Sequence, residues 1–438
     1  MSLTDLTARE GERFREWHPR SHELHERARS SLLAGVPMSW MTMWAGAHPV
    51  YLAEADGASV VDVDGNEYAD FCLGDTGAMA GHRPAPRAPA GLTTMLPTED
   101  AAWVGEELAR RFGLPLWQFS LTATDANRWM LRICRQVTGR PRVLLFNWCY
   151  HGSVDEAFVT LGDDGVVRSR AGNVGPAVDP AETTRVAEFN DIESVEAALA
   201  HGDVACLLME PALTNIGIVL PEDGFLEAVR DACTRAGTLL IIDETHTLSA
   251  GPGGCTAAWG LEPDAVTLGK SIGGGVPIGA YGVTAELAER IAAEEEADYE
   301  DTGGVGGTLA GNALSLAAAR ATLGGVLTDA AFDHMSRMRE RFVAGVEEAL
   351  ERHSVPWSVV SLGARAEYRF CPRPPRTGAE SAAAGDRDLE EYLHLYLLNR
   401  GVLITPFHNM ALMCPATTTA QVDRHTEAFD VALKELCA

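Results

Sequence analysis

The sequence predicts an α/β protein, in which a large domain with a mainly parallel sheet sandwiched by helices is joined to a smaller α+β domain. Short, continuous apolar runs alternate with segments of helical periodicity through the middle of the chain. Strands that are apolar on both faces are typical of parallel sheets covered by helices. A long helical pattern followed by two strand patterns near the end favours a second part. The length of 438 residues also favours two or more parts over one core.

The first predicted part, residues 1–70, is an N-terminal segment that contributes to the smaller domain. Residues 1–35 have a polar, helical pattern. From residue 50 to 74 the chain alternates between apolar and polar residues and carries Asp-Gly pairs at 56–57 and 64–65. Such pairs between alternating segments predict a small, hairpin-like sheet.

The large domain is predicted to span residues 71–325. Its expected helices lie at 126–139 and 224–237, and its expected strands at 142–146, 204–210, 238–243 and 264–269. This alternation indicates βαβ units. Ligands of such sheets bind beyond the carboxyl ends of the strands, which is where candidate site residues are sought.

Residues 326–438 are predicted to complete the smaller domain. A long helix at 330–353 precedes strands at 357–362 and 364–370, and a final helix is expected at 419–436. Alanine- and proline-rich stretches at 82–91 and 371–385 predict surface loops.

Composition narrows the classes of partner. The formal net charge is -27, which argues against nucleic acid or an anionic membrane surface as a partner. The polar N-terminus has no apolar leader, and no apolar run approaches the roughly 18 residues of a membrane span, so a cytoplasmic protein is expected. The nine cysteines are scattered without a C-x-x-C pair, which favours free thiols over a disulfide framework or a metal site.

Lys270 is the first candidate catalytic residue. It is one of only two lysines, with Lys434, among 35 basic residues. A solvated surface lysine is the ordinary alternative, but Lys270 stands between an apolar strand and three glycines at 273–275. Glycines permit close backbone approach, and burial favours the neutral, nucleophilic form of an amine. This context favours an amine that forms a Schiff base.

Three further features lie at predicted strand or helix ends. Asp243 follows four apolar residues, so its carboxylate is expected to need a partner such as a pyridinium nitrogen, an arginine or a metal. Thr122, Ala123 and Thr124 precede a helix, whose N-terminus favours a phosphate, although a plain threonine cap is the simpler alternative. Tyr150 follows a strand and offers an aromatic ring for stacking.

Six motifs in order carry a family resemblance. They are T-A-T-D-A-N (122–127), C-Y-H-G (149–152), E-P-A-L-T-N (210–215), D-E-T-H (243–246), G-K-S-I-G-G-G-V-P-I-G-A (269–280) and G-G-T-L-A-G-N (306–312). From about residue 48 onward the chain resembles the class III aminotransferases, most of all the glutamate-1-semialdehyde aminomutase-like branch. The resemblance implies the fold of type I enzymes that depend on pyridoxal 5'-phosphate (PLP), with a seven-stranded sheet, and a homodimer with shared active sites.

The resemblance also implies roles for individual residues. Lys270 would form the aldimine with PLP and move protons as a base, and Asp243 would hold the ring nitrogen protonated. The other implied cofactor contacts are Ala123 and Thr124 at the phosphate, Thr308 at the phosphate of the neighbouring subunit, Tyr150 on the ring, Asn215 near the phenolic oxygen, and Thr245 and His246 beside Asp243.

Three of these features depart from the family pattern. The usual G-[ST]-E-A is Ala-Thr-Asp-Ala at 123–126, and Thr245 replaces an apolar residue beneath the ring. His246 stands where methionine or glutamine is frequent, and it could contact the cofactor oxygen or the substrate, or lie behind them.

The predicted function is amino transfer from an amino acid to a keto acid, both small molecules. Arg365 could bind a carboxylate or pair with Glu367 at the surface, while Trp40 and Trp44 could line a side-chain pocket or belong to the core. His151 is a further candidate substrate contact. These residues favour an apolar or aromatic substrate, including β- or D-amino acids.

Other outcomes on the same cofactor stay open. They are an aminomutase of the glutamate-1-semialdehyde type, a racemase, a decarboxylase, and a catalytically silent PLP-binding homologue. Retention of both Lys270 and Asp243 argues against the silent homologue.

Overall fold

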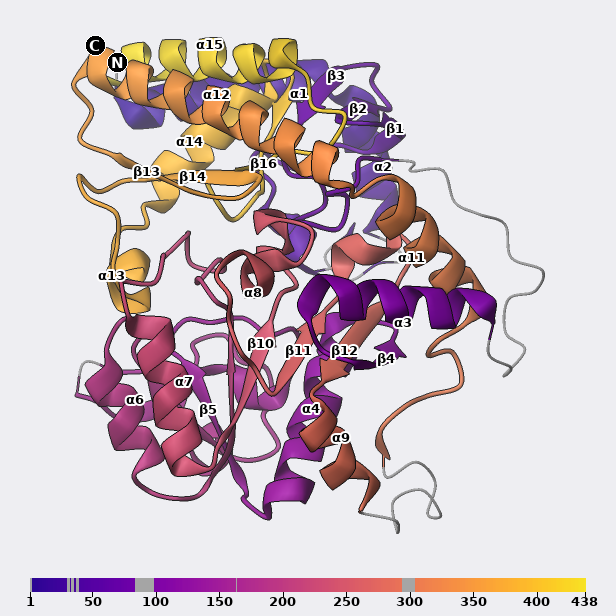
Figure 1. Cartoon of the computed structure of the whole chain (residues 1–438). Coiled ribbons are helices and arrows are strands. Elements are labelled where there is room, and N and C mark those ends of the chain that lie inside the picture. Colours follow the sequence, from indigo (N-terminus) through magenta and orange to yellow (C-terminus); the bar gives the residue numbers. More distant parts are fainter. Residues whose placement is uncertain are drawn as a thin grey trace. The chain divides into compact units, whose positions relative to one another are not determined.

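The structure, a computed structural model, describes residues 2–29, 32, 35–36, 39–82, 98–162, 164–293 and 304–438, with the backbone alone at 39–40. The chain forms two compact units (Figure 1). The first unit comprises residues 1–84, 330–374 and 384–438, and the second comprises residues 85–329 and 375–383. The domain boundaries expected after residues 70 and 325 stay a prediction.

The second unit is built on a seven-stranded sheet. In spatial order its strands are β4 (Leu116–Ser120), β12 (Gly279–Val283), β11 (Ala265–Leu268), β10 (Leu239–Asp243), β9 (Val204–Met209), β5 (Arg142–Phe146) and β8 (Thr184–Ala187). Neighbouring strands from β11 to β8 are parallel, and only β12 runs antiparallel to the strands beside it. The mainly parallel α/β sheet predicted from the apolar runs is confirmed.

Helices connect and cover these strands. They are α3 (Glu99–Phe112), α4 (Ala123–Thr138), α5 (Pro180–Thr183), α6 (Ile192–Leu199), α7 (Phe225–Ala236), α8 (Gly254–Ala258), α9 (Ala285–Ala292) and α11 (Ala313–Gly325). Helix α4 packs against β4, β9, β11 and β12, while α7 packs against β10 and lies beside α6 (Figure 1). Short elements complete the unit: η3 (Asp155–Ala157), β6 (Val159–Leu161), β7 (Val167–Ser169), η4 (Thr247–Ala250) and η5 (Lys270–Gly273).

Strands β4 and β12 were not anticipated from the sequence. Strand β12 contains Gly279 and Gly282, which are poor strand formers. A Cβ at Gly279 would overlap Ser120 and the backbone of Thr122, and one at Gly282 would overlap the ring of Trp117. The glycines therefore serve close approach of β4 to β12, which no local pattern reveals.

The first unit is α+β. Its four-stranded sheet has the order β1 (Leu52–Asp56), β2 (Ser59–Asp62), β3 (Glu67–Asp70) and β15 (Val402–Leu403), and its three-stranded sheet has the order β13 (Ser358–Leu362), β14 (Arg365–Arg369) and β16 (Met410–Leu412). Its helices are α1 (Leu3–Trp17), α2 (Pro19–Ala28), η2 (Ser39–Met43), α12 (Asp329–His353), α14 (Arg387–Leu398) and α15 (Thr419–Leu436). Strands β1, β2 and β3 pair antiparallel, which confirms the hairpin-like sheet.

One predicted surface loop is wrong in part. Within the stretch 371–385, residues Gly378–Ala383 form helix α13. The Gly378 N–H donates to Glu188 Oε1 over 2.8 Å, and the Ser381 hydroxyl donates to the carbonyl of Ile216. Tertiary hydrogen bonds thus stabilise a helix whose local signal is weak. Of the other loop, 82–91, all but residue 82 lies outside the described residues.

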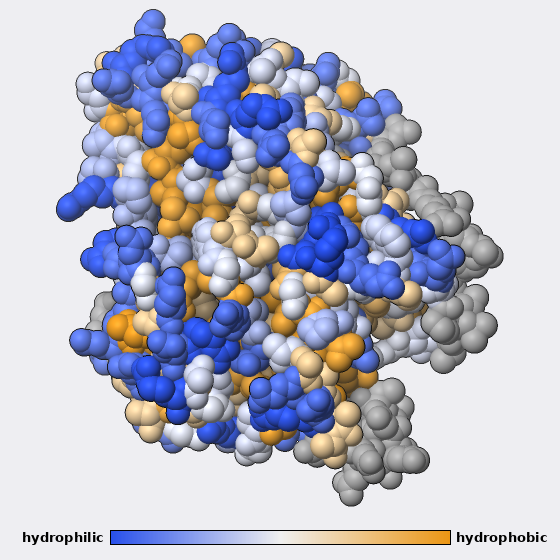
Figure 2. All heavy atoms as spheres, viewed as in Figure 1, coloured by the Kyte–Doolittle hydropathy of each residue, from blue (hydrophilic) through white to orange (hydrophobic). Residues whose placement is uncertain are grey.

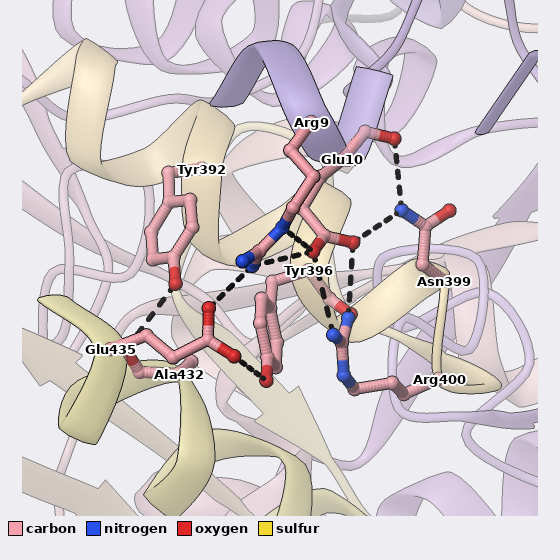
Figure 3. Close-up of polar contacts among 8 residues, drawn as sticks. All are labelled: Arg9, Glu10, Tyr392, Tyr396, Asn399, Arg400, Ala432 and Glu435. Atoms are coloured by element: carbon pink, nitrogen blue, oxygen red, sulfur yellow. Dashed lines mark hydrogen bonds and ion pairs between the residues drawn. The ribbon is translucent and has the colours of Figure 1, made fainter. Parts of the chain in front are cut away.

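A buried ionic network joins α1 to α14 within the first unit (Figure 3). Glu10 is 1% exposed, and its Oε2 accepts from Arg400 Nη1 at 3.1 Å and from Asn399 Nδ2 at 2.8 Å. Arg9 donates to Glu10 Oε1 at 3.0 Å and also bonds Glu435 of α15. Burial alone raises the pKa of Glu10, but the hydrogen bond and charge of Arg400 and the hydrogen bond from Asn399 outweigh it and lower the pKa.

Replacing Glu10 by glutamine is expected to destabilise the protein by about 2 kcal/mol, because it removes one charge of a largely buried pair. The pKa of Glu10 is lower in the folded chain than in the unfolded chain. The carboxylate therefore makes its full contribution to the free energy of unfolding above its ordinary pKa of about 4.3, and this contribution is lost as the pH falls through the folded pKa. Urea denaturation should therefore show a lower free energy of unfolding for Glu10→Gln than for wild type at neutral pH, and this difference should become smaller in acid.

Glu26→Gln, which breaks an exposed pair with Arg29, is the control, and its free energy of unfolding should differ little from that of wild type at either pH. An equal loss in both variants would refute the network's role.

The surface is mostly polar in the view shown in Figure 2, with apolar residues interspersed. Within the described parts of the chain, every helix is too short or too polar to cross a bilayer.

Candidate active site

Lys270 and Asp243 lie at the same edge of the sheet in the second unit. Asp243 ends β10, and it pairs in register with Thr267 of the adjacent parallel strand β11. Lys270 follows β11 after Gly269 and begins η5. Carboxyl ends of neighbouring parallel strands meet at one sheet edge, which is the usual ligand position in this kind of sheet. Lys270 and Asp243 therefore follow adjacent parallel strands at one edge of the sheet.

The backbone around Lys270 is unusual. Lys270 has φ +50°, a left-handed conformation that is uncommon for a residue other than glycine. Gly269 before it touches the start of α4, because a Cβ there would lie 2.9 Å from the backbone nitrogen of Ala123. Lys270 is half-buried, and η5 packs against α11. Backbone strain of this kind is frequent where a side chain must be aimed at a ligand.

Asp243 is held by a set of hydrogen bonds. It is 3% exposed. Its Oδ2 accepts from Asn127 Nδ2 at 2.8 Å and contacts His151 Nδ1 at 2.9 Å, while its Oδ1 accepts from the Thr245 N–H at 3.0 Å. Burial alone raises the pKa of Asp243, but the hydrogen bond and charge of His151 and the other hydrogen bonds lower it to about 2. The carboxylate therefore stays ionised at any ordinary assay pH.

Asn127 is a site residue to which the sequence analysis gave no role. It is fully buried on α4, and it donates to both Asp243 and the carbonyl of His151, the latter at 3.1 Å. Its Oδ1 accepts from the Thr267 hydroxyl at 2.6 Å. Asn127 thus bridges α4, β10 and β11 and fixes the direction of Asp243. It lies inside the quoted T-A-T-D-A-N motif, at helical spacing from Ala123, which was the available signal.

The N-terminus of α4 offers an anion site. Thr122 is the N-cap, and its hydroxyl accepts from the Asp125 N–H at 3.1 Å. The N–H groups of Ala123 and Thr124 open the helix and have no acceptor within it. The Thr124 hydroxyl accepts from the Ser153 N–H at 3.2 Å, which ties the helix start to the C-Y-H-G segment. The predicted threonine cap is thus observed at Thr122, whereas phosphate binding by Ala123 and Thr124 stays a prediction.

Gly152 lies against Thr124 at the start of α4. It has φ +78°, and an added Cβ would overlap the Thr124 hydroxyl and lie 3.0 Å from Thr124 Cα. Gly152→Ala is therefore expected to displace Thr124 and to raise the dissociation constant for PLP by about tenfold or more. Titration of the cofactor-free chain with PLP, followed by absorbance, measures this.

Gly139→Ala provides the matched control for Gly152→Ala. Gly139 caps the other end of α4 with a similar φ of +67°, but a Cβ there would meet nothing within 4 Å. This variant carries the same backbone strain without the overlap at Thr124. Equal affinities for PLP in the two variants would contradict an anion site at Thr124.

Other predicted cofactor contacts also lie near strand ends. Tyr150 is half-buried and packs edge-on against Phe158, with ring centroids 6.3 Å apart. Asn215 donates to the carbonyl of Trp148 at 3.4 Å. The Thr245 hydroxyl is buried and has no hydrogen-bond partner among the described residues. His246 Nε2 lies 2.9 Å from Lys270 Nζ. The contacts of these four residues with PLP stay predictions.

The remaining predicted residues are placed as follows. Thr308 is exposed, in a turn that precedes α11. His151 is 1% exposed and bonded to Asp243, so its observed contact differs from the predicted substrate contact, which stays untested. In the first unit, Trp44 packs against the hydrophobic core, and the side chain of Trp40 lies outside the described residues.

Arg365, also in the first unit, is fully buried rather than at the surface. It donates to the Thr76 hydroxyl at 2.9 Å and to Met410 Sδ at 3.3 Å. The alternative of a surface arginine is therefore wrong, whereas its predicted role as a carboxylate ligand stays a prediction.

The geometry of the second unit fits PLP. An ionised, buried carboxylate suits a protonated ring nitrogen. The first N–H groups of a helix have no acceptor within it, so the start of α4 suits a phosphate. Lys270, at the same sheet edge, supplies an amine for covalent attachment. The site residues thus suit the ring nitrogen, the phosphate and the aldehyde carbon of the cofactor.

Comparison with known proteins supports the same group of enzymes. A family model described as "Aminotransferase class-III" matches residues 41–433. Glutamate-1-semialdehyde 2,1-aminomutase 2 of Brevibacillus brevis is 31% identical over 404 residues, which are 89% of this chain and 92% of the relative.

Solved structures extend the comparison. A glutamate-1-semialdehyde aminomutase from Pseudomonas aeruginosa PAO1 is 50% identical, with a TM-score of 0.96 over 99% of this chain and 98% of that one. A variant of that protein has been solved in complex with PMP. An omega-transaminase from Sphaerobacter thermophilus is 29% identical, with a TM-score of 0.84 over 95% of this chain and 98% of that one.

Proposed function

The chain belongs to the class III aminotransferases and is a PLP-dependent enzyme, and from this premise we propose that it acts as a glutamate-1-semialdehyde 2,1-aminomutase. In this reaction an amino group moves from C2 to C1 of one molecule, while the carbonyl moves from C1 to C2. No external keto acid is consumed. Aminomutase activity was the alternative prediction from the sequence. We prefer it here to the main prediction, amino transfer from an apolar or aromatic amino acid to a keto acid.

The observation that supports this proposal best is the 50% identity to the Pseudomonas aeruginosa aminomutase over nearly the whole chain. Two relatives described as glutamate-1-semialdehyde 2,1-aminomutases, from Anaeromyxobacter sp. and Brevibacillus brevis, are 29% and 31% identical and cover 89% of this chain. The omega-transaminase from Sphaerobacter thermophilus has a lower identity, 29%, and a lower TM-score, 0.84.

The residues described above would each carry one part of the chemistry. Bound PLP supplies an electron sink that stabilises negative charge at the substrate carbon next to nitrogen. Lys270 Nζ would hold the cofactor covalently, and its amine would move protons at the substrate carbons. Asp243 keeps the ring nitrogen protonated because its carboxylate stays ionised. Asn127 and His151 orient Asp243, and the start of α4 binds the phosphate.

The test is product formation from glutamate-1-semialdehyde alone. Purified holoenzyme should convert it to 5-amino-4-oxopentanoate without any added keto acid, and Lys270→Ala should not. Absence of product from an enzyme that has PLP bound would overturn the assignment as an aminomutase.

Transamination is the second candidate, favoured by the 29% identity to the omega-transaminase over 95% of the chain. It predicts that an amino acid or amine converts the bound cofactor to its amine form, and that a keto acid then restores it. A panel of L-, D- and β-amino acids, with and without a keto acid, separates this outcome from the aminomutase reaction.

We also propose a homodimer with shared sites and a cytoplasmic location. Thr308 is exposed, and its neighbour Leu309 is an apolar side chain that is 49% exposed, as expected of a segment that a second subunit covers. All nine cysteines are free thiols, which is typical of a reducing compartment. Sedimentation at micromolar concentration tests the dimer, and Leu309→Glu should weaken it.

A further inference from the structure

His246 contacts the reactive atom of Lys270. Its Nε2 lies 2.9 Å from Nζ of the lysine, which is hydrogen-bond distance. His246 departs from the family pattern, in which methionine or glutamine is frequent at this position. It therefore places an imidazole in contact with the Lys270 amine.

The segment that carries His246 is firmly held. Glu244, two residues earlier, is fully buried. Its carboxylate accepts from the N–H groups of Cys255 and Thr256, at 3.1 and 2.5 Å, and from the Thr247 hydroxyl at 2.5 Å. The Leu248 N–H donates to the Glu244 carbonyl at 2.9 Å. Because the backbone on both sides of His246 is fixed, its imidazole is presented to Lys270 with little freedom.

The charged groups of the surrounding elements are engaged in other contacts. On β10, the Asp243 carboxylate bonds to His151 and Asn127. Glu244 faces Thr256 and Cys255 of α8. Helix α11, which packs against η5, has a single charged residue, Arg320, and this forms an ion pair with Asp100. Among the contacts described for this part of the chain, the His246 imidazole lies at hydrogen-bond distance from Nζ.

The direction of the hydrogen bond follows from proton affinities. An ammonium group is a donor only, whereas a neutral imidazole has one nitrogen that accepts. In general an imidazole is neutral above about pH 6.5, whereas an amine is still protonated there. A neutral His246 then accepts from Nζ and stabilises the ammonium form.

We propose that His246 is a positioning residue for Lys270, whose Nε2 accepts a hydrogen bond from Nζ, aims the amine, and stabilises its protonated form once the amine has taken up a proton. This inference rests on the proposed function, in which the released Lys270 returns a proton to a substrate carbon. The hydrogen bond would keep that proton on Nζ between the two transfers.

The presence of only two lysines makes a direct test possible. The full chain without cofactor is labelled briefly with acetic anhydride at near-neutral pH, and acetylation of Lys270 and Lys434 is compared by mass spectrometry. Lys434 is exposed and serves as the internal reference in every variant. Since no substrate or PLP is present, the result is independent of whether the aminomutase assignment holds.

Two variants separate hydrogen bonding from packing. His246→Met keeps a side chain of similar length but removes the acceptor, so the ratio of Lys270 to Lys434 labelling should rise about tenfold, as expected from loss of one hydrogen bond to a charged group. His246→Gln retains an acceptor near the position of Nε2, and its ratio should stay within about twofold of wild type. In the holoenzyme, kcat should fall in His246→Met with little change in KM and be largely restored in His246→Gln.

The inference is overturned if His246→Met labels like wild type, or if the glutamine variant labels like the methionine variant. Equal labelling of both variants would mean that bulk or access, rather than a hydrogen bond, governs the amine. Unchanged Lys434 labelling and near-ultraviolet circular dichroism verify that each variant is folded.

Discussion

Lys270→Ala is expected to abolish covalent attachment of PLP and to lower turnover by at least about 10⁴-fold. The Lys270 amine serves turnover in two ways, by the covalent bond to the cofactor and by proton transfer at the substrate carbons, and the variant loses both. Proton transfer by a positioned side chain alone raises a rate by up to about 10⁴-fold. Borohydride reduction of the holoenzyme, followed by peptide mass spectrometry, should find the cofactor mass on the peptide that contains Lys270. The same treatment of the variant should find no modified peptide.

Lys434→Ala is the natural control, because Lys434 is the other lysine of the chain. It lies exposed in the last turn of α15, within the first unit, and it should leave both labelling and turnover unchanged. Cofactor mass on Lys434 in wild type, or turnover by Lys270→Ala close to that of wild type, would contradict the assignment of Lys270.

The features of the fold and site that could be predicted from the sequence share a physical basis. Strands β9 and β10 are fully buried, so their residues had to be continuously apolar and were visible as runs. Asp243 stood out because a carboxylate directly after such a run needs a partner. Lys270 stood out because the chain otherwise uses arginine almost throughout. Each of these signals is local in the sequence.

What could not be predicted depends on contacts between distant segments. Asn127 and Asp243 are 116 residues apart, and only the packing of α4 on the sheet brings them to 2.8 Å. Glu10 and Arg400 are 390 residues apart, and either alone resembles an ordinary surface residue in the sequence. Strand β12 was hidden because the glycines that permit its close packing weaken the strand pattern. The contact of His246 with Lys270 likewise depends on how η4 and η5 follow adjacent strands.

Asp243→Asn is expected to lower turnover by about 10³-fold while PLP remains bound through Lys270. The substitution preserves shape but removes the charge that keeps the ring nitrogen protonated, and so weakens the electron sink in the transition state. A carboxylate whose pKa is lowered to about 2 is ionised throughout the assay range, so the loss should be nearly constant with pH. Steady-state kinetics across a pH series, with cofactor content measured by absorbance, provides the test. Turnover within about tenfold of wild type would show that Asp243 does not hold the ring nitrogen.

Asn127 allows the role of Asp243 to be examined by a double-mutant cycle. Asn127→Ala removes one hydrogen bond to the Asp243 carboxylate, which is then less firmly oriented, and turnover should fall about tenfold. The loss is smaller than in Asp243→Asn because the charge of Asp243 is retained. If Asn127 acts through Asp243, the same substitution should cost little in the Asp243→Asn background, since the charge that it orients is already gone. Full additivity of the two losses would instead assign Asn127 an independent role, for example in packing α4 against β11 through Thr267. The cycle therefore distinguishes orientation of the carboxylate from stability of the surrounding sheet.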